Sequence, residues 1–315
     1  MAKKAKRALV TGGAGFIGSR LCDALLADSV EVVCLDNFTT GRAENIASAG
    51  GDPRFTVVEA DVTEPLDVKA DMIFHLASPA SPLDYYEMPV ETLLANSLGT
   101  LNCLDLADRL GVRMLMASTS EVYGDPEVSP QTEEYYGHVN PVGLRSCYDE
   151  GKRFGEALCK AFERKSETDV VIVRIFNTYG ARMRKDDGRV IPNFVCQALD
   201  GEPLTIYGDG SQTRSFCHVS DMVDGLLRAM RTPEASGEIV NLGNPNEMRV
   251  IDLAARIREM TSSESAMVFE ALPQDDPLQR KPDITKAMRL LGWAPRIGLE
   301  EGLGDVIAWF SEGRG

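Results

Sequence analysis

The sequence predicts an α/β protein in which helices cover both faces of a parallel sheet, with a smaller lobe formed by the C-terminal part of the chain. Short apolar segments alternate with amphipathic, helix-like segments from Arg7 onward, as in a doubly wound sheet. A glycine-rich turn separates the first apolar segment from the first helix. The length of 315 residues, 43% of them hydrophobic, suffices for one large domain and an additional lobe.

The first unit consists of a strand, a turn, a helix and a second strand, which we place at residues 7–11, 12–18, 19–27 and 31–36. The glycines of the turn let the backbone approach a pyrophosphate, and the helix amino terminus adds N–H groups and a positive dipole end. Asp36 ends the second strand, where a carboxylate accepts hydrogen bonds from the adenosine ribose and favours NAD over NADP. A purely structural turn is the alternative. The strand, helix and acid in their expected places favour a Rossmann-type dinucleotide site.

Further strands are predicted at residues 55–60, 72–77, 113–118 and 170–176, with a helix at 90–110. Ligands of such sheets lie at the carboxyl ends of the strands, which places Asp61 near the adenine and Leu76 near the nicotinamide. His75 is interpreted as a strand residue rather than a catalyst. The residues expected to contact NAD are Gly12, Gly15, Phe16, Ile17, Gly18, Asp36, Asn37, Asp61, Val62, Leu76, Ala77, Tyr148, Lys152 and Thr178.

Two polar motifs follow these strands. The stretch from Ser118 to Gly124 lies at the carboxyl end of the fifth strand, and Tyr148 precedes Lys152 by four residues at the start of a predicted helix. The helical spacing puts Tyr148 and Lys152 on one face, where the ammonium favours the phenolate and lowers the tyrosine pKa. Either motif alone has an ordinary explanation, a strand-end cap or a solvated lysine. Together with the dinucleotide layout they predict a proton-transfer site.

After about residue 180 the sequence predicts loops rich in glycine, proline and arginine, including a polar loop at 274–283, with helices at 250–261 and 299–311. The arginines at positions 182, 184, 189 and 214 suit phosphate or carboxylate recognition. A strand at 238–243 is expected to return to the first sheet. We therefore expect an NAD-binding domain of residues 1–178, joined by about 215–245, and a ligand-binding lobe of residues 179–214 and 246–315.

Composition excludes several classes of protein. The formal net charge of -15 argues against nucleic acid or an acidic membrane surface as a partner. No apolar run is long enough to cross a bilayer, and the basic start, which we interpret as a short solvated arm, does not resemble a signal peptide. Seven scattered cysteines without a Cys-x-x-Cys motif predict reduced thiols in a cytosol, and the three histidines show no metal-ligand spacing.

The chain resembles the extended short-chain dehydrogenase/reductases that act on nucleotide sugars, and among these the UDP-glucuronic acid decarboxylases, or UDP-xylose synthases. The resemblance rests on the glycine turn, on Tyr148 with Lys152, and on long matching stretches at residues 75–82, 118–126, 146–153, 174–180, 187–190, 207–216 and 275–283. Membrane-anchored members exist in animals, whereas this sequence shows no anchor, so a cytoplasmic form is expected. The resemblance also implies a homodimer that pairs through the helices at about 90–110 and 148–165.

In enzymes of this kind NAD takes a hydride from C4 of the sugar, and the resulting 4-keto acid loses CO₂ before the hydride returns. The resemblance implies that Tyr148 removes the C4 hydroxyl proton, that Lys152 holds the nicotinamide ribose and that Thr119 binds the C4 oxygen. Glu121 and Arg280 match positions around the carboxylate and C5. The residues that match family positions for the UDP part, with Arg280 also on the substrate, are Asn177, Arg189, Asn193, Tyr207 and Arg214.

Ser120 separates this chain from related dehydratases, which carry an Asp-Glu pair where Ser120-Glu121 stands. A serine supplies no carboxylic proton to a leaving hydroxyl, so dehydration is disfavoured. The expected reaction is decarboxylation of UDP-glucuronate to UDP-xylose. The alternatives are another UDP-sugar reaction, either 4-epimerisation or oxidative decarboxylation that releases the 4-keto pentose, and a non-catalytic dinucleotide sensor. The sensor is disfavoured because the proton-transfer residues are present.

Overall fold

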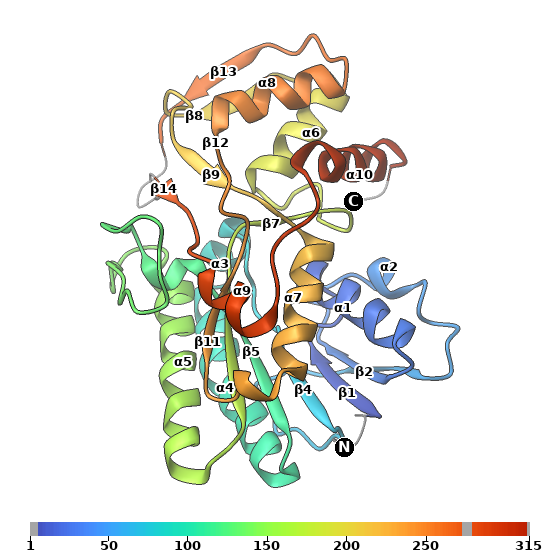
Figure 1. Cartoon of the computed structure of the whole chain (residues 1–315). Helices are drawn as coiled ribbons and strands as arrows, with labels where there is room; N and C mark the ends of the chain where they lie inside the picture. Colours follow the sequence, from blue (N-terminus) through green and yellow to red (C-terminus); the bar gives the residue numbers. More distant parts are fainter. Residues whose placement is uncertain (1–5, 273–278, 314–315) are drawn as a thin grey trace.

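The protein is built around a seven-stranded sheet, seen in a computed structural model that describes residues 6–272 and 279–313 (Figure 1). Every neighbouring pair of strands is parallel. The chain runs outward from β1 to one edge and then returns to add strands on the other side, so the order reverses between β1 and β4. In lateral order the strands are β11 (Ile239–Leu242), β6 (Val170–Ile175), β5 (Arg113–Thr119), β4 (Met72–His75), β1 (Arg7–Thr11), β2 (Glu31–Asp36) and β3 (Phe55–Glu59).

Helices cover both faces of this sheet. Side chains alternate between the faces, since Ala8 and Val10 belong to one apolar cluster and Leu9 to another. The first cluster packs under α1 (Phe16–Ala27), α7 (Val219–Arg231) and α9 (Thr285–Leu291). The second packs under two long helices that lie against each other, α4 (Pro89–Leu110) and α5 (Ser146–Ser166). This arrangement confirms the predicted doubly wound parallel sheet.

A smaller lobe lies beyond the carboxyl ends of the strands (Figure 1). It has an apolar core of its own, to which Phe194, Ile206 and Leu253 contribute. Its helices are α6 (Val190–Asp200), α8 (Val250–Met260) and α10 (Leu299–Ser311). Its strands form two small sheets, one of β12 (Glu247–Arg249), β9 (Thr213–Ser215) and β14 (Gln279–Arg280), the other of β13 (Met267–Glu270) and β8 (Leu204–Tyr207).

The remaining elements are short. They are α2 (Ala43–Ile46), α3 (Pro82–Glu87), the 3₁₀ helices η1 (Ser120–Tyr123) and η2 (Pro233–Ala235), and the parallel pair β7 (Thr178–Tyr179) and β10 (Cys217–His218). Among the described residues, no helix has the length and apolar character needed to cross a bilayer.

The sequence-based boundaries need three corrections. Helix α1 begins at Phe16 rather than Ser19, because the turn ends within the glycine motif. Helices α6 and α7 lie where loops were expected, since their apolar residues are interspersed with the Pro and Gly that suggested loops. The expected polar loop includes β14, while its residues 274–278 lie outside the described chain, as does most of the amino-terminal arm. Strand β11 does return to the sheet, beside β6; the division into two domains stays a prediction.

Candidate active site

One cavity of about 650 Å³ lies between the carboxyl ends of the strands and the smaller lobe. All the residues proposed from the sequence line it, although they come from positions 12 to 280 of the chain. On the sheet side these are Gly12, Gly15, Phe16, Ile17, Gly18, Asp36, Asn37, Asp61, Val62, Leu76, Ala77, Thr119, Ser120, Glu121, Tyr148, Lys152, Asn177 and Thr178. From the smaller lobe and the segments leading to it come Arg189, Asn193, Tyr207, Arg214 and Arg280.

The glycine turn forms a cradle that admits no side chains. Gly12 has a φ of +70°, and a Cβ atom there would lie 2.8 Å from the Ala77 nitrogen. A Cβ atom on Gly18 would collide with the Gly12 carbonyl oxygen, so the first turn of α1 packs directly on the loop. The space left open in front of this helix start suits a pyrophosphate, which helix N–H groups bind. The turn therefore fits a dinucleotide.

Two acids line the far end of the cradle. The Asp36 carboxylate is buried and accepts hydrogen bonds from the backbone nitrogens of Ala14 and Phe38, both at 2.9 Å. Burial raises the pKa of Asp36, and these two backbone donors oppose the rise. Asp61 accepts a hydrogen bond from the Asn37 side chain at 2.9 Å. Both carboxylates keep lone pairs for ribose or adenine donors.

Tyr148, Thr119 and Lys152 form the centre of the cavity's sheet side, because α5 starts beside the end of β5. Thr119 and Tyr148 share a hydrogen bond through their hydroxyls, and Lys152 donates to the Ala117 carbonyl at 2.8 Å. The Lys152 ammonium lies 5.8 Å from the centre of the Tyr148 ring. Burial lowers the Lys152 pKa to about 8. These three residues were expected at one site from the sequence, and they line the same part of the cavity.

The expected pKa shift of Tyr148 was wrong in sign. Burial raises the Tyr148 pKa to about 12, outweighing the lowering effect of the Thr119 hydrogen bond. At 5.8 Å from the ring centre, the Lys152 ammonium does not compensate for the lost hydration of a phenolate. A further positive charge is needed beside the phenol before it can act as a base near neutral pH.

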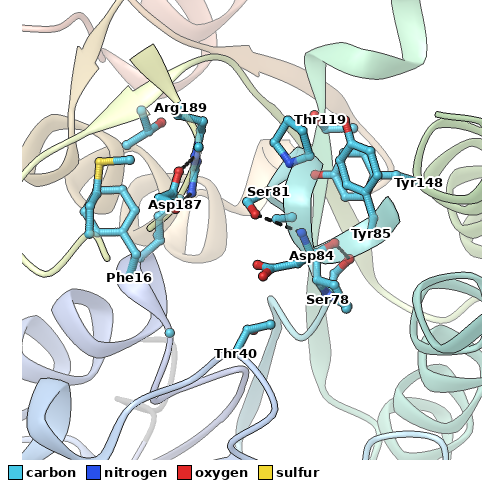
Figure 2. Close-up of a pocket in the computed structure, with 18 of the residues that line it drawn as sticks. Phe16, Thr40, Ser78, Ser81, Asp84, Tyr85, Thr119, Tyr148, Asp187 and Arg189 are labelled. Carbon is cyan, nitrogen blue, oxygen red and sulfur yellow. Dashed lines mark hydrogen bonds and ion pairs between the residues drawn. The ribbon is translucent and has the colours of Figure 1, made fainter. Parts of the chain in front are cut away.

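Tyr85, on α3, is a site residue that the sequence did not reveal. Its ring stacks on Tyr148 with centroids 5.2 Å apart and planes 8° from parallel. It is almost fully buried, and its hydroxyl has no hydrogen-bond partner among the described residues. In Figure 2, Tyr85, Tyr148 and Thr119 form one wall of the pocket, opposite the Asp187–Arg189 pair. Its place three residues after the matching stretch 75–82 is the signal in the sequence that could have revealed it.

Beside this wall, two guanidinium groups enclose the Glu121 carboxylate. Arg145 Nη2 donates to Glu121 Oε2, and Arg280 Nη2 lies 3.3 Å from the same oxygen. Arg280 also donates to the carbonyl oxygens of Ser120 and Gly124, which fixes its orientation. Together the two arginines hold the Glu121 pKa down at about 2 against the opposing effect of burial. Glu121 is thus an ionised carboxylate at neutral pH.

Arg145 was not identified from the sequence, although it precedes Tyr148 by three residues and so lies one helical turn away. Its Nε atom lies 4.0 Å from Oδ2 of Asp149, a second buried carboxyl. Burial and the charge of Glu121 raise the Asp149 pKa to about 8. Two neighbouring carboxyls therefore have opposite protonation states at neutral pH.

The smaller lobe presents the other polar groups. Arg189 pairs with both oxygens of Asp187, with Nη2 to Oδ2 at 2.7 Å, and Asn193 donates to the Gly188 carbonyl at 3.2 Å. Tyr207 is 39% exposed at the end of β8. Arg214, on β9, donates to the Thr213 carbonyl. These groups face the sheet side across the cavity.

The four arginines singled out in the sequence, at positions 182, 184, 189 and 214, all line this cavity. Arg182 pairs with Asp23 at 2.6 Å and Arg184 with Asp84 at 2.6 Å, so each of these two is matched by a different carboxylate. His75 is buried in β4 between the hydroxyls of Thr11 and Thr100, in line with its predicted strand role. Among the described residues no cluster of His, Cys, Asp and Glu is placed to hold a metal ion.

A dinucleotide cradle, a Tyr-Thr-Lys unit and an enclosed carboxylate thus share one cavity. The family model described as "NAD dependent epimerase/dehydratase family" matches residues 8–243. The chain belongs to this family.

Curated relatives within the family show which of its enzymes the chain resembles in sequence. It is 53% identical over 309 residues to UDP-glucuronic acid decarboxylase 1 of Danio rerio, covering 98% of this chain and 73% of that protein. It is 52% identical over 313 residues to UDP-glucuronic acid decarboxylase 4 of Arabidopsis thaliana, covering 98% and 70%.

Solved structures of family members share the fold. UDP-glucuronic acid 4-epimerase from Bacillus cereus, in complex with UDP-glucuronic acid and NAD, superimposes with a TM-score of 0.88 at 28% identity, covering 97% of this chain and 99% of that one. Likeness to decarboxylases is therefore much greater in sequence than likeness to this epimerase. NAD is the cofactor of the family and fits the cradle described above.

Proposed function

We propose that this protein is an NAD-dependent carboxy-lyase that converts UDP-glucuronate to UDP-xylose through a transient UDP-4-keto sugar. The observation that carries the proposal is the pairing, in one cavity, of a Tyr-Thr-Lys unit with an ionised Glu121 enclosed by two arginines. The identity of 53% to a UDP-glucuronic acid decarboxylase over 98% of the chain supports it.

Chemistry at C4 is assigned to the sheet side of the cavity. Tyr148 removes the C4 hydroxyl proton, Thr119 orients the C4 oxygen and Lys152 holds the nicotinamide ribose and provides positive charge. NAD, when bound, accepts and returns the C4 hydride, and its cationic ring supplies the positive charge that a phenolate in this buried position needs. The shared hydroxyl contact of Thr119 and Tyr148 supports placing both at the same substrate oxygen.

Residues of the cradle would hold the cofactor. The open space before α1 receives the pyrophosphate, and Asp36 accepts from the adenosine ribose, which excludes a 2′-phosphate by charge repulsion. Asp61 with Val62 and Asn37 would contact the adenine side, and Leu76 the nicotinamide side. Thr178 completes the wall near the nicotinamide.

Loss of CO₂ follows from the chemistry of the oxidised sugar. A ketone at C4 is β to the C6 carboxylate, so it accepts the electron pair of the breaking C5–C6 bond and forms an enolate. Glu121 and Arg280 are assigned to the surroundings of C5, where that enolate must be protonated. Ser120 offers no carboxylic acid for expelling a hydroxyl, which supports decarboxylation rather than dehydration.

The smaller lobe is assigned to the UDP part of the substrate. Arg189 and Arg214 supply donors for a diphosphate, and Tyr207 supplies an aromatic ring at the exposed rim. Asn177 and Asn193 supply amide groups for phosphate or sugar. Arg189 is held by Asp187, which keeps its guanidinium fixed while part of it still faces the cavity.

We further propose a homodimer that forms through the outer faces of α4 and α5. Apolar side chains remain exposed there, with Val90 at 60%, Leu98 at 39% and Phe154 at 52% exposure. Size-exclusion chromatography with light scattering tests the dimer, and a monomer at micromolar concentration would contradict it.

All seven cysteines are unpaired and buried, which supports a reducing, cytoplasmic environment.

Incubation of the purified protein with UDP-glucuronate and NAD tests the function, with CO₂ trapping and NMR of the sugar nucleotide as readouts. We expect equal amounts of CO₂ and UDP-xylose and no net NADH. The alternative is another UDP-sugar reaction, favoured by the likeness to the 4-epimerase at a TM-score of 0.88. Epimerisation would give UDP-galacturonate without CO₂, and oxidative decarboxylation would leave the 4-keto pentose with stoichiometric NADH. Absence of CO₂ would contradict the proposal.

A further inference from the structure

The proposed decarboxylation consumes one proton that the chemistry at C4 does not supply. The hydride taken from C4 returns to C4, and the proton that Tyr148 takes from the C4 hydroxyl returns to the C4 oxygen. Breaking the C5–C6 bond, however, leaves an electron pair on the C5 enolate, and a new C5–H bond forms only when a proton arrives. This proton must be held near C5 and replenished from solvent.

The groups already placed near C5 are poor stores for this proton. Glu121 is held ionised by Arg145 and Arg280, which keep its pKa at about 2. The two guanidinium groups do not release protons near neutral pH. Tyr148 is occupied with the C4 oxygen. A proton can pass through Glu121 briefly, but it must be drawn from another group.

Asp149 is a buried carboxyl that no assigned step uses. Its side chain is 8% exposed, and its Oδ1 atom has no hydrogen-bond partner among the residues that the structure describes. Its Oδ2 atom lies 4.0 Å from Arg145 Nε, on the guanidinium that also binds Glu121. One arginine therefore bridges the two carboxyls. An ionised Asp149 with an unbonded oxygen in this position would cost much more free energy than a protonated one.

Charged groups on η1, at the start of α5 and on β14 act on Asp149. Glu121 on η1 and Glu150 on α5 disfavour its ionisation, while Arg145 at the start of α5 and Arg280 on β14 favour it. Tyr85 on α3 and Tyr148 on α5 are neutral neighbours whose own pKa values are raised by burial. The net result is a pKa of about 8 for Asp149, so that it carries its proton at pH 7.

We propose that Asp149 stores the proton that Glu121 delivers to C5 of the decarboxylated sugar. The inference rests on the proposed function. The Asp149 O–H bond breaks as Glu121 accepts the proton, and the Glu121 O–H bond then breaks as the C5–H bond forms. Solvent returns a proton to Asp149 before the next turnover. Asp149 acts only through Glu121, by keeping a proton ready for it, and does not touch the sugar.

The redox state of the bound cofactor during turnover distinguishes this role from the titration of Lys152, whose pKa is also about 8. Loss of the Lys152 charge slows oxidation at C4 and leaves the cofactor oxidised. Loss of the Asp149 proton slows the step after oxidation and leaves it reduced. The nicotinamide absorbance in the steady state, measured with UDP-glucuronate over pH values on both sides of 8, reports which step is slow.

For the wild type we expect the reduced fraction to increase as the pH rises through about 8. Asp149→Asn should have a high reduced fraction at every pH and form UDP-xylose on the order of 10–100-fold more slowly. Asp149→Glu should restore a pH-dependent reduced fraction, which a purely structural role would not. Asp67→Asn, the same change at a fully exposed aspartate that does not line the cavity, is the matched control and should behave as the wild type.

Several results would overturn the inference. One is a wild-type cofactor that stays oxidised, or equally reduced, across this pH range, and this result does not depend on any variant folding. Another is an Asp149→Asn protein with an unchanged pH dependence of the reduced fraction. If the wild type releases no CO₂ at all, the proposed function fails and the inference with it. If CO₂ is released normally but Asp149→Asn matches Asp67→Asn, the inference alone fails.

Discussion

The C4 region, Thr119 with Tyr148 and Lys152, and the C5 cluster, Glu121 with Arg145, Asp149 and Arg280, differ in how the fold assembles them. The C4 region joins the end of one strand to the start of one helix. The C5 cluster needs a 3₁₀ helix, the first turn of α5 and a strand of the smaller lobe, so that Glu121 meets Arg280 across 159 positions of sequence.

Their electrostatics differ as well. The C4 region contains a phenol and an ammonium whose pKa values both move against ionisation, because burial dominates. In the C5 cluster the arginines prevail at Glu121, which stays ionised, and burial prevails at Asp149, which stays protonated. The C4 region therefore needs the positive charge of its cofactor before Tyr148 can ionise. In the C5 cluster the protein's own charges set the protonation states of Glu121 and Asp149.

Removing the Tyr148 hydroxyl should give the largest effect on the C4 region. We expect Tyr148→Phe to lower kcat on the order of 10⁴-fold, since no other group in this wall can take the C4 proton. NAD affinity, measured by titration calorimetry, should stay within a few-fold of the wild type. Tyr136→Phe, on a ring that is 88% exposed, is the control. Substantial turnover by Tyr148→Phe would remove Tyr148 from its assigned role.

A buried ion pair joins the helix and the strands that carry the C4 region. Breaking this pair tests how much it contributes to the free energy of unfolding. Arg174 on β6 pairs with Glu156 on α5 at 2.8 Å, and Glu156 also accepts from Ser118 at 2.6 Å. Arg174→Met should lower the free energy of unfolding by about 3–5 kcal/mol, because it leaves a buried carboxylate unpaired.

Urea denaturation would measure this loss. The control is Arg249→Ala, which breaks an exposed pair with Asp252 at the start of α8 and should change the free energy of unfolding much less. Equal losses in the two variants would show that burial of the Glu156–Arg174 pair does not matter.

Neutralising Glu121 should slow the chemistry at C5 much more than the chemistry at C4. We expect Glu121→Gln to slow UDP-xylose formation on the order of 10²-fold, because the amide cannot relay a proton to C5. Hydride abstraction at C4 should be much less affected. Rapid-quench analysis of product, alongside nicotinamide absorbance, checks both. Glu127→Gln, on an exposed glutamate of the following loop, is the control. Equal slowing of oxidation and product formation would contradict the separation.

A smaller effect is expected in the acid stability of the protein. The folded-state pKa of Glu121 is about 2, below its ordinary value of 4.5, so its contribution to stability is fully present above pH 4.5. That contribution is lost as the pH falls from 4.5 toward 2. The free energy of unfolding of Glu121→Gln should therefore decrease less steeply than that of the wild type over this range. Parallel curves would indicate that Glu121 is not held ionised by its arginines.

Local sequence patterns were sufficient for the sheet and the C4 region. The strands of the sheet are apolar and buried, and glycine turns and i, i+4 spacings act over a few residues. Helix α7 was missed because its apolar residues are interspersed with glycine and charged residues, although they pack on the sheet once the helix forms. Arg280 was placed near the site only through the resemblance, since its contact with Glu121 depends on the packing of the smaller lobe.

The pKa values could not be predicted from the sequence, because they depend on burial. Tyr148 beside Lys152 suggested a lowered pKa, and only the folded chain reveals the stack with Tyr85 and the loss of water that raise it. Asp149 stands next to Tyr148 in the sequence and gave no signal, because nothing local shows that it is buried beside Glu121 and Arg145.

The division of labour between the C4 region and the C5 cluster is tested most directly by a single turnover of UDP-glucuronate on excess enzyme, with NADH, CO₂ and UDP-xylose followed together. With Tyr148→Phe we expect none of the three. With Glu121→Gln we expect NADH and CO₂ to form at close to the wild-type rates while UDP-xylose lags far behind. If Glu121→Gln forms NADH as slowly as Tyr148→Phe does, Glu121 is needed for oxidation at C4. That result would contradict the division of labour between the C4 region and the C5 cluster.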